Sequence, residues 1–177
     1  MRKFLLFIWE ITKITIIALI IVIPIRVFIF QPFFVSGASM EPNFHNLDYL
    51  IVDEISYRLG EPHRGDVIIF YNPNNTSQRF IKRVIALPNE TIKIQAGNVY
   101  IQQPQENEFV LLDEAEYLAE GIKTNRDQVI ILNENQYFVM GDNRNSSYDS
   151  RFFGPLDEKH IIGRNILKLL NIQLFSK

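Results

Sequence analysis

The pattern of hydrophobic and polar positions divides the chain into two unequal parts. From Phe4 to Phe30 the residues are almost all apolar, and Ile14 to Ile25 contains no charged residue. Three charged residues stand toward the two ends of this stretch: Glu10, Lys13 and Arg26. An apolar run of this length can cross the hydrocarbon core of a bilayer as one helix, with its flanking charges at the interfaces. The pattern predicts a short N-terminus and membrane anchor over 1–30 and a separate domain over 31–177.

A cleaved secretory signal is the alternative for the apolar stretch. The small residues Ser36-Gly37-Ala38 could form a cleavage site after an apolar core. The anchor is favoured because the stretch is long for a signal core. Cleavage there would also leave Ser39 as the new N-terminus, which conflicts with the motifs described below.

The distribution of basic residues predicts the orientation of the anchor. Three of them precede its apolar centre: Arg2, Lys3 and Lys13. After Arg26 no Lys or Arg follows until Arg58. The positive-inside rule therefore places the N-terminus in the cytoplasm and residues 31–177 outside, with the lipid bilayer as a partner of the chain.

Aromatic residues follow the anchor: Phe28, Phe30, Phe33 and Phe34. They are expected to mark the exit from the bilayer, which would hold Ser39 within a few residues of the membrane surface. Ordinary core packing is the alternative for Phe33 and Phe34.

The rest of the chain alternates short β-type runs with turn signals and shows no long amphipathic helix. The predicted strands are Tyr49 to Val52, Asp66 to Tyr71, Arg79 to Leu87, Thr91 to Gln95, Asn98 to Ile101, Phe109 to Leu112, Gln128 to Leu132, Gln136 to Met140 and Ile161 to Leu170. The last run could equally be a helix. The polar, acidic stretch 102–124 is expected to be an exposed excursion. The predicted fold is mainly β, an antiparallel β-rich domain preceded by one N-terminal transmembrane helix.

Composition excludes several classes of function. The 177 residues have room for one membrane segment and one modest domain. Residues 31–177 hold 14 basic and 19 acidic residues, a net charge of −5, so no nucleic-acid partner is expected. The chain has no cysteine, and its three histidines lack metal-ligand spacing. We therefore expect neither a metal nor a cofactor.

Ser39 is the candidate nucleophile. The small neighbours Gly37 and Ala38 would leave its hydroxyl open to an approaching carbonyl, although a plain loop serine before Pro42 would look the same. A serine hydroxyl needs a base within hydrogen-bond reach. His63, close to Asp66, could supply a histidine triad, but it lies in a polar turn that favours a solvated side chain.

Lys82 is the second candidate base. On a strand with a two-residue period it shares a face with Phe80, Val84 and Ala86, while Arg83 points to the other face. Burial among apolar groups disfavours the charged ammonium, which is how a lysine becomes a general base. An edge-strand lysine that prevents aggregation is the alternative interpretation.

Three ordered motifs resemble the type I signal peptidases. They are Ser39-Met40-Glu41-Pro42 just after the anchor, the strand Lys82-Arg83-Val84-Ile85-Ala86-Leu87-Pro88, and Gly141-Asp142-Asn143-Arg144 continuing to Asp149-Ser150-Arg151-Phe152-Phe153-Gly154. Each motif alone is weak, but the ordered set over roughly residues 26 to 163 is highly specific.

The resemblance implies a role for each matching residue. Ser39 would be the nucleophile, Lys82 the general base, and Ser147 the hydroxyl that orients the lysine amine. Asp149 and Arg151 would form a structural ion pair near the site. Where some members place a serine that donates to the oxyanion, this chain has Gly37, so the oxyanion hole would rest on the backbone N–H of Ser39.

The resemblance also implies a function, a membrane-anchored serine endopeptidase that removes signal peptides from exported preproteins. Self-cleaving repressors share the serine–lysine pair but lack the anchor and the Gly-Asp-Asn-Arg block. A membrane-tethered, non-enzymatic β-domain that binds a protein partner is the alternative from another class. A glycan on the sequon at Asn145 would crowd Ser147, which favours a bacterial plasma membrane as the location.

Overall fold

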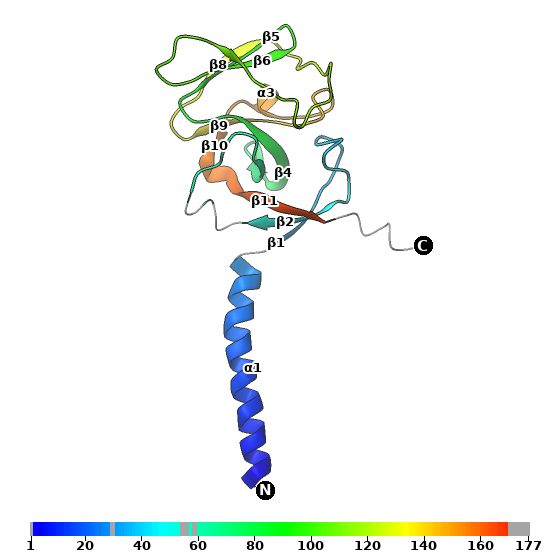
Figure 1. Cartoon of the computed structure of the whole chain (residues 1–177), viewed down its shortest axis with the longest axis vertical. Helices are drawn as coiled ribbons and strands as arrows, with labels where there is room; N and C mark the ends of the chain where they lie inside the picture. Colours follow the sequence, from blue (N-terminus) through cyan, green and yellow to red (C-terminus); the bar gives the residue numbers. More distant parts are fainter. Residues whose placement is uncertain (1, 29–30, 54–56, 58–59, 170–177) are drawn as a thin grey trace, which may run out of the picture.

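The structure, a computed structural model, describes residues 2–28, 31–53, 57 and 60–169. Its N-terminal helix α1 (Arg2–Phe28) projects from the β-rich remainder of the chain (Figure 1). Its described side chains from Arg2 to Val22 are exposed, and this segment is long and apolar enough to cross a membrane. The predicted N-terminal helix is confirmed. Residues 29 and 30 of the predicted span lie outside the described residues.

Short strands build the domain, with one short helix and one 3-10 turn among the described residues. The elements are β1 (Gln31–Phe34), β2 (Tyr49–Asp53), β3 (Val67–Asn72), β4 (Asn75–Ala86), β5 (Thr91–Gln95), β6 (Asn98–Gln102), β7 (Val110–Leu111), β8 (Gln128–Ile131), β9 (Gln136–Met140), α3 (Ser150–Phe153), β10 (Leu156–Asp157), η1 (Glu158–His160) and β11 (Ile161–Leu169).

These strands form two antiparallel sheets. The larger has the order β1-β2-β11-β3-β4-β9-β10, and the smaller has the order β7-β6-β5-β8. The larger sheet lies between α1 and the smaller sheet, which is farthest from the anchor (Figure 1). The prediction of a mainly β, antiparallel fold is confirmed.

Two apolar clusters hold the sheets in place. One covers a face of the larger sheet and includes Ile68, Phe70 and Val84. The other joins the end of the larger sheet to the smaller one, through contacts that include Ile85 and Ile92. Strand β4 contributes to both clusters and crosses the middle of the larger sheet, so it is a rigid support for any side chain that it carries.

A third cluster fixes the segment that follows the anchor. Met40 and Phe44 are buried against Leu50 of β2 and Ile81 of β4. The backbone N–H of Val35 donates to the Asp48 carbonyl at 3.0 Å, and Leu47 N–H donates to the Val35 carbonyl at 2.8 Å. Residues 35–48 therefore form a closed loop pinned to the larger sheet on both sides of Ser39.

Several local predictions need correction. The run from Ile161 is a strand rather than a helix, because it pairs with both β2 and β3; Leu170 lies outside the described residues. Strand β4 begins at Asn75, inside a predicted turn, because Asn75 pairs with Asn72. The short elements β1, α3 and β10 were not predicted, since two to four residues carry no periodic signal.

The two phenylalanines before Ser39 belong to strand β1, and their expected place at the exit from the bilayer stays a prediction. Phe33 packs against the cluster around Met40. Phe34 is exposed and makes an edge contact with Tyr49, with ring centroids 5.1 Å apart. Core packing therefore accounts for Phe33 but not for Phe34.

Candidate active site

Ser39 and Lys82 meet in the structure, although 43 positions separate them in the chain. Ser39 lies on the closed loop and is partly exposed, whereas Lys82 on β4 is only 4% exposed. The Lys82 Nζ donates to Ser39 Oγ at 2.8 Å and to the Ile81 carbonyl at 2.8 Å. The first contact would also let a neutral amine accept the hydroxyl proton.

The setting of Lys82 follows from its position on β4. Lys82 pairs with Ile68 across the sheet, so its stem lies on the face covered by Ile68, Phe80 and Val84. Burial lowers the pKa of the Lys82 ammonium to about 8, against the opposing attraction of the Asp149 and Asp142 carboxylates. A substantial fraction of this amine is therefore neutral at mildly alkaline pH.

Ser147 is buried beside the pair. A Cβ atom on Gly141 would lie 2.3 Å from both Ser147 Oγ and the Ser39 carbonyl oxygen, so only glycine allows this close approach. Among the described residues, Ser147 Oγ has no hydrogen-bond partner of standard geometry, although it lies near enough to Asp149 to help lower the pKa of that carboxyl. Its role in orienting Lys82 stays a prediction.

Asp149 and Arg151 form an ion pair with both side chains fully buried. Arg151 Nη2 donates to Asp149 Oδ2 at 2.8 Å, and Gly141 N–H donates to the same oxygen at 3.0 Å. Burial alone would raise the pKa of Asp149, but the hydrogen bond and charge of Arg151 and the Gly141 N–H hold it below its usual value. The pair fixes the turn that carries Ser147.

A second ion pair, which the sequence did not reveal, supports the loop of Ser39. Arg83 donates from Nε and Nη2 to the two oxygens of the buried Asp142 carboxylate, at 2.8 and 2.7 Å. Asn43 donates to Asp142 Oδ2 at 2.8 Å and to the Tyr117 carbonyl at 2.7 Å. The sequence did hold one signal for this pair. The two-residue alternation places Arg83 on the face of the strand opposite Lys82, and a charge that packs there needs an acidic partner.

The acidic stretch 102–124 is less detached than an exposed excursion. Glu114 pairs with the fully buried Arg144, which also donates to Thr124 Oγ1 at 2.6 Å. The Tyr117 ring lies 4.3 Å from the Arg83 guanidinium carbon. Glu114 and Thr124 thus tie the stretch to Arg144, and Tyr117 ties it to Arg83, while most other residues of the stretch are exposed.

Gly37 adopts a φ of +94°, a conformation that side-chain-bearing residues rarely adopt. Its N–H donates to Asn46 Oδ1 at 2.9 Å, so the turn before Ser39 is held by the loop itself. A serine at this position would therefore strain the backbone.

A groove of about 300 Å³ opens at Ser39 and Lys82. Its apolar walls come from Phe33, Phe34, Phe80 and Ile81, and Ser146 and Tyr148 close another side. An extended peptide could lie in this groove with its carbonyl carbon at Ser39 Oγ.

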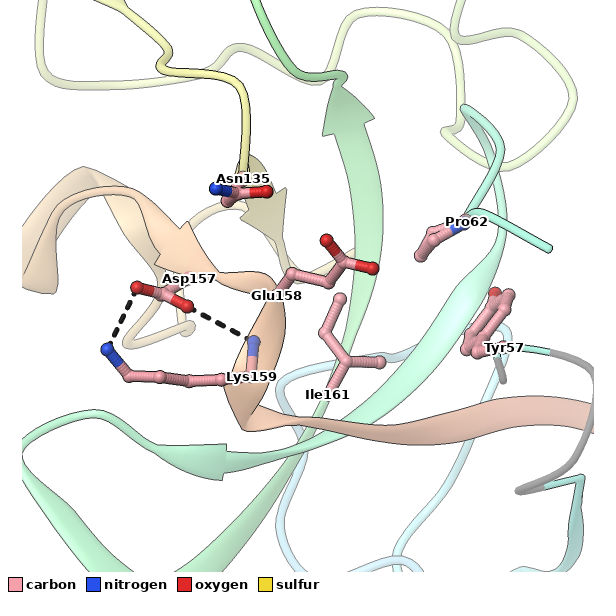
Figure 2. A pocket seen from close by; sticks show the side chains of 7 residues that line it. All are labelled: Tyr57, Pro62, Asn135, Asp157, Glu158, Lys159 and Ile161. Atoms are coloured by element: carbon pink, nitrogen blue, oxygen red, sulfur yellow. Dashed lines mark hydrogen bonds and ion pairs between the residues drawn. The ribbon is translucent and has the colours of Figure 1, made fainter. Parts of the chain in front are cut away.

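A different pocket, of about 480 Å³, lacks the groups for this chemistry (Figure 2). Figure 2 shows Lys159 folded back onto Asp157, at 2.9 Å from Nζ to Oδ2. The Tyr57 hydroxyl donates to Asp66 Oδ2, and burial raises the pKa of Tyr57. The pocket therefore offers no activated nucleophile.

His63 does not meet Ser39 in this arrangement. Its side chain is 82% exposed and its Nδ1 lies 3.7 Å from Asp66 Oδ2, while the hydroxyl of Ser39 is engaged by Lys82. The geometry favours lysine over histidine as the base.

A β-rich scaffold that joins a partly exposed serine to a desolvated lysine beside an extended groove indicates a serine peptidase. The family model described as "Signal peptidase, peptidase S26" matches residues 8–170. The chain belongs to this family of signal peptidases.

Comparison with known proteins finds similar relatives and a similar solved structure. A "Probable signal peptidase I-2" of Synechocystis sp. is 34% identical over 165 residues, which cover 90% of this chain and 72% of the relative. "Signal peptidase I" of Bacillus licheniformis is 35% identical over 165 residues, covering 92% and 87% of the two chains. A crystal structure of a signal peptidase I from Enterococcus faecalis has a TM-score of 0.48 and 31% identity, covering 59% of this chain and 97% of that one.

Removing the Ser147 hydroxyl tests whether it positions Lys82. If the hydroxyl orients the amine, Ser147→Ala should lower kcat by roughly 10- to 10³-fold with little change in KM, because nucleophile and base both remain. Steady-state cleavage of a preprotein would measure both constants. Ser77→Ala, on an exposed part of β4, is the matched control. Full activity of Ser147→Ala would reduce this residue to a structural role.

Proposed function

We propose that Ser39 and Lys82 form the catalytic pair of a serine peptidase that removes signal peptides from preproteins. The observation that carries the proposal is the 2.8 Å contact between Ser39 Oγ and the buried Nζ of Lys82. Removal of signal peptides follows from membership of the family. The assignment of individual residues is supported by the geometry described above.

The first half of the reaction forms an acyl-enzyme. The neutral Lys82 amine takes the Ser39 proton as the oxygen attacks the carbonyl carbon of the last signal-peptide residue. The oxyanion accepts a hydrogen bond from the Ser39 backbone N–H. When the tetrahedral intermediate collapses, the Lys82 ammonium returns the proton to the departing amine, which becomes the N-terminus of the mature protein.

The second half of the reaction releases the signal peptide. A water molecule gives its proton to Lys82 and attacks the ester carbonyl, and the ammonium then returns the proton to Ser39 Oγ. Lys82 is neutral again at the end of each half of the reaction. The burial that lowers its pKa therefore favours its action as a base in both halves.

The groove accounts for the substrate class. An extended peptide would lie beside the strands that line the groove. Its residues at positions −1 and −3, counted back from the bond that is cut, would face shallow pockets. The phenylalanine-rich walls of a groove of about 300 Å³ leave room for small side chains.

A non-enzymatic binding domain is not favoured. Such a domain would gain nothing from a lysine that is 4% exposed and whose charged form is disfavoured by burial. A desolvated amine opposite a hydroxyl is a costly arrangement that general-base chemistry explains.

We also propose that residues 1–30 are a cytoplasmic N-terminus and a single membrane anchor, and that 31–177 form an extracytoplasmic catalytic domain at a bacterial plasma membrane. The exposed apolar surface of α1 and the proximity of β1 to its end support the arrangement (Figure 1). The basic residues Arg2, Lys3 and Lys13 support the orientation, and Arg26 opposes it.

Substitutions of the pair test the mechanism. Ser39→Ala and Lys82→Ala should each abolish cleavage of a preprotein by detergent-solubilised protein, and Lys82→Arg should fail because a guanidinium stays protonated. Lys159→Ala, which removes an exposed lysine, should keep full activity.

In the wild type, kcat/KM should rise with pH and level off above about 8, because only the neutral amine is a base.

Two results would contradict the mechanism. A value of kcat/KM that stays constant between pH 6 and 9, a window set around the lowered lysine pKa, would show that Lys82 is not the base. Retained activity in Lys82→Ala together with a loss in His63→Ala would replace the pair with a histidine triad.

Protease accessibility tests the orientation. External protease should digest the domain after the anchor in intact spheroplasts, because positive charge holds the N-terminus inside. A tag at Met1 should stay protected until the membrane is permeabilised. Protection of the domain in intact spheroplasts, with digestion of the tag, would reverse the orientation.

A further inference from the structure

A second hollow lies beyond Ser39, on the side away from the groove. We call it the distal hollow; its volume is about 240 Å³ and it is lined by Glu41, Pro42, Leu118, Ala119, Ile122 and 142–145. In the loop of Ser39, residues 36–39 line the groove and Glu41 and Pro42 line the distal hollow. In the facing block, Ser146 and Tyr148 line the groove and 142–145 line the distal hollow.

The two facing segments are joined at the nucleophile. Asn143 N–H donates to the Ser39 carbonyl at 3.0 Å, and Asn143 Nδ2 donates to the Ala38 carbonyl at 3.1 Å. Each of the two segments therefore contributes residues to both the groove and the distal hollow, and the Asn143 hydrogen bonds to Ala38 and Ser39 lie between them. A peptide that is extended across Ser39 would continue from one into the other.

The lining of the distal hollow has a definite chemistry. Its outer wall is apolar, formed by Leu118, Ala119 and the 42%-exposed Ile122. The buried charges at its base are neutralised, since Asp142 pairs with Arg83 and Arg144 pairs with Glu114. In the part of the chain that the structure describes, the half-buried carboxylate of Glu41 has no ion pair.

Side-chain alternation selects the residue that would reach this hollow. In an extended peptide the side chains of positions −3 and −1 share one face, and the next side chain on that face is at +2. Position +1 points the other way. The peptide bond to be cut lies at Ser39, so position +2 falls on the side of the distal hollow.

We propose that the distal hollow is the subsite for the second residue after the scissile bond, and that it selects an uncharged apolar side chain there. This inference rests on the proposed function. Burial of a branched apolar side chain against the apolar wall stabilises the complex by removing apolar surface from water. The unpaired Glu41 carboxylate repels an acidic one, and its partial burial limits screening by solvent.

Four preproteins that differ only at position +2 test the proposal with full-length, detergent-solubilised protein. Leu against Ala isolates apolar volume, and Asn against Asp isolates charge. We expect kcat/KM to be about tenfold higher for Leu than for Ala, and several-fold higher for Asn than for Asp.

Two variants assign these preferences to the hollow. Ile122→Asp should abolish the preference for Leu over Ala, because it puts a charge in the apolar wall. Glu41→Gln should abolish the difference between Asn and Asp while keeping the preference for Leu. Ile131→Asp makes the same change at a 73%-exposed position of the smaller sheet and should alter neither preference.

The outcomes separate this proposal from the function. Equal cleavage of all four preproteins would overturn the proposed subsite but not the proposed peptidase function. Wild-type preferences that persist in both Ile122→Asp and Glu41→Gln would also overturn it. Failure of the wild type to cleave any preprotein would overturn both proposals. If Ile122→Asp does not fold, as judged by thermal unfolding, the Glu41→Gln result decides.

Discussion

The contact between the buried Lys82 amine and the Ser39 hydroxyl is the constraint on which the rest of the site depends. In the proposed mechanism, the Lys82 amine must be desolvated enough to lose its proton near neutral pH and close enough to Ser39 to accept a proton from its hydroxyl. Strand β4 accounts for the desolvation of Lys82, because it lies in the middle of the larger sheet with apolar neighbours on the lysine face. The closed loop of residues 35–48 supplies the proximity, because Met40 and Phe44 anchor it to the same sheet.

This arrangement opposes stability. A folded-state pKa of about 8, below the 10.5 of an ordinary lysine, means that the unfolded chain binds the proton more tightly. The cost to folding is about 3 kcal/mol, since each pKa unit corresponds to about 1.4 kcal/mol. It is fully present below pH 8 and disappears as the pH rises toward 10.5. The two buried ion pairs, Arg83–Asp142 and Asp149–Arg151, hold the surrounding turns in place in spite of it.

The fold and the site were predictable to different degrees. The anchor and most of the longer strands carry clear patterns, because a long continuous apolar run predicts a helix and a two-residue alternation predicts a strand. Ser39 and Lys82 were predictable from three ordered motifs. The network around them was not: Asn43, Glu114, Tyr117 and Thr124 lie in stretches with no periodicity, and their value comes from partners distant in the chain. The strand at Phe33 and Phe34 was hidden for a related reason, since two phenylalanines so soon after an anchor look like its continuation.

The pKa of Lys82 is the quantity on which the mechanism depends most directly. An NMR titration of lysine labelled with ¹³C at Cε, in the detergent-solubilised protein, would measure it, and the resonance missing from Lys82→Arg would assign the signal. We expect the Lys82 resonance to titrate near pH 8. A Lys82 resonance that titrates at or above the ordinary value of about 10.4 would contradict it, because such an amine could not act as the base.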